Sequence, residues 1–122
     1  MARSTARAAV QPLPATGLVA FVKRACPTCE LVEPAFRRAA VECAALTFVS
    51  QDDVKFPAGV ARLVDDRELD HSYLNGIEAV PTLIRFEGGR EVERVMGWDR
   101  AAWQRLTGIA DLGAEYPALR PG

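Results

Sequence analysis

Apolar side chains follow two kinds of pattern along this chain: short uninterrupted runs, and longer stretches in which they recur every three or four residues. Residues 18–22 form an uninterrupted apolar run, which is typical of a central strand buried on both faces. Over residues 27–45 the apolar positions recur at helical spacing, which predicts a helix with one buried face. Pro34 falls inside this helix, and we expect a kink there because proline removes one backbone hydrogen bond.

The later part of the chain alternates between the same two patterns. Strand-forming residues and the positions of glycine and proline separate its strands from its helices. The pattern predicts strands at 46–49, 82–86 and 91–96, a helix at 60–74, and a last helix that ends near Gly108.

Two local motifs define the ends of these elements. Residues 87–90, Glu-Gly-Gly-Arg, are typical of a hairpin turn, so the strands on either side of them are expected to pair antiparallel. Asp99 suits the N-cap of the last helix, and Trp98 and Trp103 have the spacing of a hydrophobic staple around it. We therefore expect both tryptophans to pack at the start of that helix.

The order of the elements predicts an α/β fold with a central mixed four-stranded sheet flanked by helices. A helical crossover between the first two strands makes them parallel, and the final hairpin adds two antiparallel strands to the same sheet. The domain is predicted to span residues 17–110. We expect a flexible N-terminal tail over 1–16, which contains two prolines and no acidic residue, and a loosely held C-terminal tail over 111–122.

Composition narrows the class of protein. A chain of 122 residues, 49% of them hydrophobic, has the size and apolar content of a single domain. Its net charge of −1 provides no overall field that would attract nucleic acid or an anionic membrane, and no apolar run is long enough to span a bilayer. The first residues lack the apolar stretch of a secretory signal and resemble a transit peptide only weakly. We therefore expect a cytoplasmic protein with no nucleic-acid or membrane partner.

The most informative chemistry is the cysteine pair Cys26 and Cys29, which stands where the first strand meets the first helix. Pro27 suits the first helical position, which makes Cys26 the predicted N-cap. Unpaired N–H groups and the helix dipole stabilise a thiolate there, and the thiolate is the nucleophile in thiol–disulfide exchange. Lys23 and Arg24 add positive charge and are candidates for tuning the pKa of Cys26 to about 4 to 7. Alternatively, these two side chains are a solvated strand end.

A zinc site is the structural alternative for the cysteine pair, with Cys43 and His71 completing the ligand set. Cys43 lies fourteen residues after Cys29, roughly 21 Å along a helix, so one metal ion would not reach both. We therefore predict no metal site. Cys43 is expected to be a small core residue, and Asp70 and His71 lie on a charge-rich helix where a solvated surface is the default and no role is assigned.

The order of elements, with Cys26-Pro27-Thr28-Cys29 at the first strand–helix junction, resembles the thioredoxin superfamily over about residues 17–109. Pro34, five residues after the second cysteine, matches the helix-kinking proline of that superfamily. Two further features match it as well: Val80-Pro81-Thr82 resembles its cis-proline motif, and Gly97 matches a glycine after the last strand.

The resemblance implies a thioredoxin-like fold and a thiol:disulfide oxidoreductase. Cys26 would attack a substrate disulfide and Cys29 would resolve the mixed disulfide. The residues implied to shape the substrate groove are Pro27, Thr28, Val80, Pro81, Thr82 and Gly97. The implied partners are protein disulfides or dithiols together with a reductase or glutathione, and no cofactor is needed.

Two departures from the thioredoxin pattern keep other functions open. Ala25 precedes the first cysteine in place of tryptophan, and Pro27-Thr28 between the cysteines resembles glutaredoxins, so a glutathione-dependent oxidoreductase is one alternative. Ala20 occupies the position of a buried acid that assists the resolving cysteine in thioredoxins. Its absence favours a second alternative, a redox-sensing or binding module with little turnover.

Overall fold

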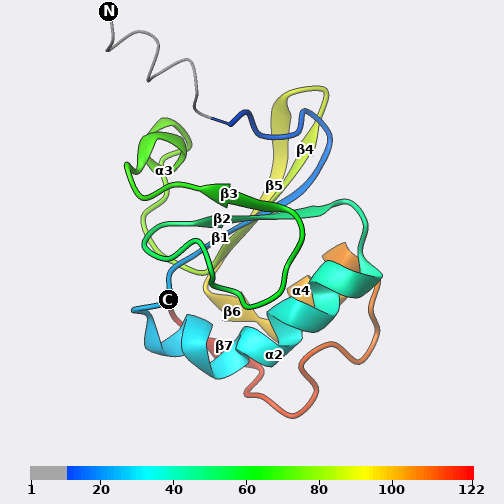
Figure 1. Ribbon diagram of the computed structural model, residues 1–122. Coiled ribbons are helices and arrows are strands. Elements are labelled where there is room, and N and C mark those ends of the chain that lie inside the picture. The colour runs from blue at the N-terminus through cyan, green and yellow to red at the C-terminus, as the bar shows by residue number, and fades with distance from the viewer. Residues whose placement is uncertain (1–10) are drawn as a thin grey trace, which may run out of the picture.

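A computed structural model describes residues 11–122 of the chain (Figure 1). The part of the expected N-terminal tail before residue 11 lies outside the described residues. The elements in chain order are β1 (Gly17–Val22), α2 (Pro27–Glu42), β2 (Leu46–Ser50), β3 (Leu63–Asp65), α3 (Asp70–Leu74), β4 (Thr82–Glu87), β5 (Arg90–Met96), β6 (Trp98–Asp99), α4 (Arg100–Thr107) and β7 (Leu119–Arg120).

The central sheet is mixed and has the strand order β3-β2-β1-β4-β5. β1 pairs parallel with β2 and antiparallel with β4, and the β4–β5 hairpin is antiparallel, which confirms the predicted α/β class and topology. The predicted number of strands is wrong, because β3 adds a fifth strand beside β2. The spacing of apolar residues in 60–74 predicts one long helix, but three of these residues pair with β2 and only α3 is helical. Pairing with a neighbouring strand overrides a weak local pattern here.

The two long helices cover one face of the sheet. Figure 1 shows α2 and α4 together on one side of the strands, with α3 on the other side near β3. Alternate residues of β1 enter two separate cores, with Ala20 and Val22 facing the helices and Val19 and Phe21 facing away from them. Burial of β1 from Leu18 to Val22 confirms that it is the central strand.

Aromatic rings connect the two long helices. The rings of Phe36 in α2 and Trp103 in α4 stack with their centroids 5.2 Å apart, and Trp98 lies 5.4 Å from Trp103. The Asp99 side chain caps α4 by accepting a hydrogen bond from the N–H of Ala102. The predicted N-cap and the predicted packing of both tryptophans are therefore confirmed.

The segment after α4 packs against the domain, so the expectation of a loosely held tail over 111–122 is wrong. Leu112 is fully buried, and β7 pairs antiparallel with β6. The Trp98 indole N–H donates to the carbonyl of Pro117 across 3.0 Å. Proline, glycine and polar residues give this segment no periodic pattern, and long-range contacts order it instead.

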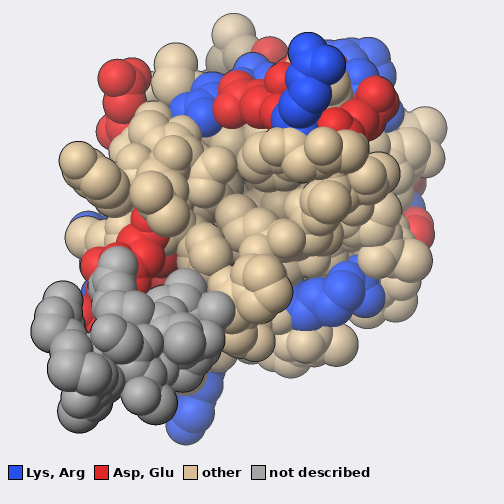
Figure 2. Space-filling view, turned by 90° about the horizontal axis from the view of Figure 1, so that it is seen from above, with Lys and Arg blue, Asp and Glu red and all other residues tan. Residues whose placement is uncertain are grey.

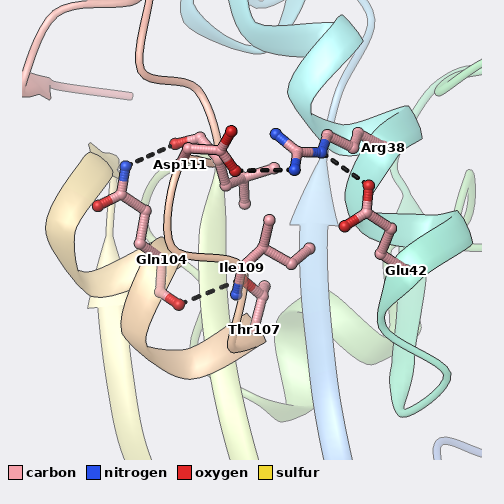
Figure 3. Close-up of polar contacts among 7 residues, drawn as sticks. Arg38, Glu42, Gln104, Thr107, Ile109 and Asp111 are labelled. Carbon is pink, nitrogen blue, oxygen red and sulfur yellow. Dashed lines mark hydrogen bonds and ion pairs between the residues drawn. The ribbon is translucent and has the colours of Figure 1, made fainter.

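Side chains on α2 and α4 secure the beginning of this segment (Figure 3). Arg38 of α2 forms ion pairs with Glu42 and with Asp111, at 2.7 and 2.8 Å. Gln104 of α4 donates from its side-chain amide to the carbonyl of Leu112. Both helices therefore fix the chain where it leaves α4.

Residues 11–16 also contact the folded domain. The N–H of Gly89 in the hairpin turn donates to the carbonyl of Ala15 across 2.8 Å, and the side chain of Leu13 packs against the core on the face away from α2. For these residues, the expectation of a flexible tail is wrong.

Charged side chains of both signs lie close together on the surface. On the face seen in Figure 2, Lys and Arg alternate with Asp and Glu along one margin, while the middle of the face is uncharged. Arg85 pairs with Glu87, and Arg94 pairs with Glu91. This face therefore carries no extended patch of a single sign. None of the helices within residues 11–122 is long and apolar enough to cross a membrane.

Candidate active site at the start of α2

Cys26 is the N-cap of α2, as predicted. Its backbone is extended, with φ −133° and ψ 115°, and Pro27 follows as the first helical residue. The N–H of Cys29 donates to Cys26 Sγ across 3.2 Å. This N–H is one of the donors that a helix leaves unpaired in its first turn, so the hydrogen bond favours negative charge on the Cys26 sulfur.

The two sulfurs differ in their access to solvent. Cys26 is 7% exposed, whereas Cys29 is completely buried, and both are free thiols. Burial is the largest cause that raises the pKa of Cys29, and its hydrogen bond with Cys26 is the next; a hydrogen bond with the Lys23 backbone lowers this pKa, and the charges of Cys26 and Asp52 raise it by less. Cys29 is therefore held as a thiol, and Cys26 is the more accessible sulfur of the pair.

The loop before β4 brings Val80 against Cys26. The Cys26 thiol donates to the carbonyl of Val80 across 3.4 Å, and the Val80–Pro81 peptide bond is cis. Thr82 opens β4 and pairs with Phe21 of β1, so the sheet positions this loop. The Thr82 hydroxyl donates to the carbonyl of Ala79 across 2.6 Å and is buried, so it supports the loop instead of lining the groove.

Thr28 and Gly97 both lie next to residues 120–122, which include the last residue of β7. The Thr28 hydroxyl donates to the carbonyl of Pro121 across 2.6 Å and accepts from Arg120 Nε at 3.1 Å. Gly97, with φ +76°, donates from its N–H to the carbonyl of Pro81 across 2.7 Å. The structure thus brings the predicted groove residues together, and it adds β7 to them.

A cavity of about 380 Å³ opens beside Cys26. This volume is within the range typical of small-molecule sites. Its lining includes residues of the loop before β4, among them Glu78, and the polar residues Lys23 and Gln51. The full set of lining residues is Lys23, Ala25, Cys26, Pro27, Gln51, Ile77, Glu78, Ala79, Val80 and Gly122.

The two basic residues before the cysteines have different surroundings. Lys23 lines the cavity together with Cys26. The Arg24 side chain is 62% exposed, and its Nε lies 3.7 Å from a carboxylate oxygen of Asp53. Of the two, Lys23 is therefore the one that shares the cavity with the nucleophile.

Asp52 is a site residue that the sequence analysis missed. Its two carboxylate oxygens accept hydrogen bonds from the N–H groups of Arg24 and Ala25, at 2.7 and 3.0 Å. These bonds fix the loop that leads into Cys26. The sequence contained part of the information needed to predict this role of Asp52. β1 and β2 are parallel neighbours, so residues just beyond their carboxyl ends meet at one edge of the sheet.

Ala20 has no carboxylate that could act on Cys29, but Asp52, from another part of the sequence, has one. Ala20 is fully buried in β1. The negative charge of Asp52 is one cause of the raised pKa of Cys29, so this carboxylate acts electrostatically on the resolving thiol.

Cys43 and His71 lie away from this site. Cys43 is the C-cap of α2, at the opposite end of the helix from Cys26, and it is half-buried against the core. His71 is buried in α3, with its Nε2 2.5 Å from the carbonyl of Gln11, so the expected solvated position is wrong for this residue. Within residues 11–122, no three His, Cys, Asp or Glu side chains are grouped to hold a metal ion.

Comparisons with known proteins place the fold. No protein-family model matches the chain, and no curated protein sequence matches it. Solved structures do match. The structure of MTB dsbF in its mixed oxidized and reduced forms is similar with a TM-score of 0.61 and 20% identity, covering 79% of this chain and 81% of that chain.

Two further solved structures give the same result. StoA from Bacillus subtilis matches with a TM-score of 0.59 and 17% identity, over 80% of this chain and 85% of that chain. Mitochondrial thioredoxin 3 from Saccharomyces cerevisiae, in its oxidized form, matches with a TM-score of 0.54 and 18% identity, over 80% and 79%. The chain has a thioredoxin fold. The fold implied by the resemblance in the sequence is therefore confirmed. Cys26 and Cys29 lie at the start of the first long helix of that fold.

Proposed function

We propose that this thioredoxin-fold protein is a thiol:disulfide oxidoreductase in which Cys26 is the nucleophile and Cys29 the resolving thiol. The observation that carries the proposal is the pairing of an N-cap sulfur with a buried thiol one helical turn away. The N–H of Cys29 donates to Cys26 Sγ, and only Cys26 keeps any exposure to solvent. A structural cysteine pair does not require this difference between its members.

The reaction proceeds in two exchange steps. The Cys26 thiolate attacks one sulfur of a substrate disulfide, and the other sulfur leaves as a thiolate that takes up a proton from solvent. Cys29 then loses its proton and attacks Cys26 Sγ, which releases the second substrate sulfur. The substrate gains two electrons, and the protein is left with a Cys26–Cys29 disulfide.

A reductant of the dithiol or glutathione class returns the protein to its free-thiol form. The proposed substrates are protein disulfides or dithiols that lie along Pro27, Val80 and Pro81, and the proposed setting is the cytoplasm, where thiols are kept reduced. Subcellular fractionation checks the setting, and enrichment in another compartment contradicts it.

Glutathione-dependent exchange is a second candidate, favoured by the cavity beside Cys26. Its volume of about 380 Å³ and its polar residues Lys23, Gln51 and Glu78 suit a small charged thiol compound. Turnover of a mixed disulfide of glutathione, compared with turnover of insulin, separates the two candidates.

The proposed function is tested by oxidation of the reduced protein with one equivalent of a small disulfide, followed by mass spectrometry of its peptides. We expect the Cys26–Cys29 peptide to lose two hydrogens while Cys43 stays reduced. A midpoint potential measured in the same system then gives the direction of electron flow, because known pairs range from about −270 to −120 mV. Failure to form this disulfide, or stoichiometric partner binding without turnover, would favour a redox-sensing or binding module.

A further inference from the structure

The segment formed by residues 119–122 lies across the candidate active site. Figure 1 shows this end of the chain beside the start of α2. Gly122 lines the cavity together with Cys26 and packs directly on the main chain of Val80. A Cβ atom at position 122 would overlap the Val80 carbonyl oxygen and would stand 2.7 Å from its carbon and 3.1 Å from its nitrogen. Only glycine fits this position.

Three sets of contacts hold the segment there. β7 pairs with β6, with Arg120 opposite Trp98. The Thr28 hydroxyl joins Pro121 and Arg120 to the first turn of α2. A Cβ on Gly97 would stand 2.9 Å from the carbonyl oxygen of Arg120, so the chain before β6 also approaches the segment closely. The segment is therefore part of the wall of the site.

The position of the segment limits how a substrate approaches the nucleophile. Cys26 Sγ lies 3.4 Å from the Val80 carbonyl, so a sulfur attacked by Cys26 must lie beside the Val80 main chain. An extended peptide that follows this main chain would meet Gly122. Lys23, Gln51 and Glu78 line the same cavity, but the contacts that hold residues 120–122 are made to Thr28, Gly97, Val80 and β6.

We propose that residues 120–122 determine specificity by occupying the Val80 side of the groove, so that a disulfide within a protein substrate reacts more slowly than a small disulfide until the segment is displaced. This inference rests on the proposed exchange activity of Cys26 and Cys29. A small disulfide reaches Cys26 from the Lys23 side, whereas a polypeptide must first displace the segment. The apparent affinity for polypeptides is therefore the intrinsic affinity multiplied by the fraction of molecules in which the segment is open.

The test compares two substrates, insulin and hydroxyethyl disulfide, in the full chain and in a chain shortened to Leu119. We expect the shortened chain to raise the ratio of kcat/KM for insulin to kcat/KM for the small disulfide about tenfold, as for a segment that covers the groove about nine-tenths of the time. The control is Leu119→Ala, because that side chain is 71% exposed and alters the segment without uncovering Val80.

An unchanged or lowered ratio of insulin to small-disulfide turnover in the shortened chain would overturn the proposal. If the shortened chain does not fold, Gly122→Val decides the question, because a side chain at this position cannot remain against Val80 and the same rise is expected. Absence of turnover with both substrates in the full chain would contradict the proposed function itself. Failure of the proposed function and failure of the proposed role of residues 120–122 are therefore distinguishable.

Discussion

The Cys26 thiol donates a hydrogen bond to the main-chain carbonyl of Val80 across 3.4 Å, although the two residues are 54 positions apart in the sequence. The antiparallel pairing of β1 with β4 makes this contact possible, because it aligns Phe21 with Thr82 and so brings the end of β1 to the loop before β4. Cys26 and Val80 are thus positioned by the central strands of the sheet.

Replacing single cysteines separates their roles. Cys26→Ser is expected to lower the rate of disulfide reduction by about a thousandfold or more, because the attacking thiolate is lost. Cys29→Ser leaves the first step intact, so a mixed disulfide between Cys26 and the substrate should accumulate and be detectable by mass spectrometry. Cys43→Ser is the matched control and should keep most of the activity, because Cys43 lies at the far end of α2.

The buried thiol of Cys29 predicts how stability depends on pH. Its pKa is raised in the folded protein, so above the ordinary thiol pKa the folded state binds more protons than the unfolded state. The contribution of Cys29 to the free energy of unfolding is therefore fully present below about pH 8.5. Above that pH it falls by up to about 1.4 kcal/mol per pH unit. Urea unfolding of the reduced protein between pH 8 and 10 measures this slope.

Serine does not titrate in this range, so Cys29→Ser provides the control for the pH prediction. The slope of the wild type minus that of the variant isolates the contribution of Cys29, because every other titratable group is present in both proteins. Equal slopes would mean that Cys29 is not held as a thiol in the folded state.

Asp52→Asn tests how the loop before the nucleophile is held. The variant keeps one acceptor but loses the charge-assisted bonds to the N–H groups of Arg24 and Ala25, so we expect a loss of about 1–2 kcal/mol in stability. Removing the negative charge should also lower the pKa of Cys29 and speed resolution of the mixed disulfide at neutral pH. Stopped-flow measurement of substrate release reports the second effect.

Asp53→Asn is the matched control for this variant. The Asp53 carboxylate accepts from the N–H of Lys55 within its own loop and pairs with the exposed side chain of Arg24. A change in the resolution rate as large as that in Asp52→Asn would show that the effect is general electrostatics and not specific to Asp52.

Gly113→Ala tests the packing of the segment after α4. Gly113 has φ +66°, and a Cβ there would stand 2.8 Å from Cη2 of the Trp98 ring. We expect a loss of about 1–3 kcal/mol from this overlap, beyond the cost of the backbone conformation. Gly108→Ala is the control, because Gly108 has φ +76° but open space around its Cβ position. Equal losses in thermal unfolding of the two variants would contradict close packing at Gly113.

Local patterns predicted the features that depend on neighbours in sequence. The buried run of β1, the N-cap position of Cys26 and the glycine turn between β4 and β5 are all specified within a few residues. Features that depend on distant partners escaped prediction. β3 exists because Leu63 and its neighbours pair with β2, and the role of Asp52 exists because β2 ends beside β1.

The candidate site shows the same division between local and distant determinants. Both cysteines and the loop at Val80 and Pro81 follow from motifs, whereas the contact of Gly122 with Val80 follows only from tertiary packing. The residues after 110 have no periodic pattern, and their position depends on Trp98, Thr28 and β6.

The central place of β1 has a consequence for hydrogen exchange. Its amides are paired on both edges with β2 and β4, and its side chains from Leu18 to Val22 are buried on both faces, so these amides should exchange only when the whole domain unfolds. The two-residue ladder between β6 and β7 is short and has exposed neighbours, so its amides should exchange through local opening. The strand that leads to the cysteines and the segment against Val80 are thus expected to belong to cooperative units of different stability, so that this segment can open while Cys26 and Cys29 keep their positions.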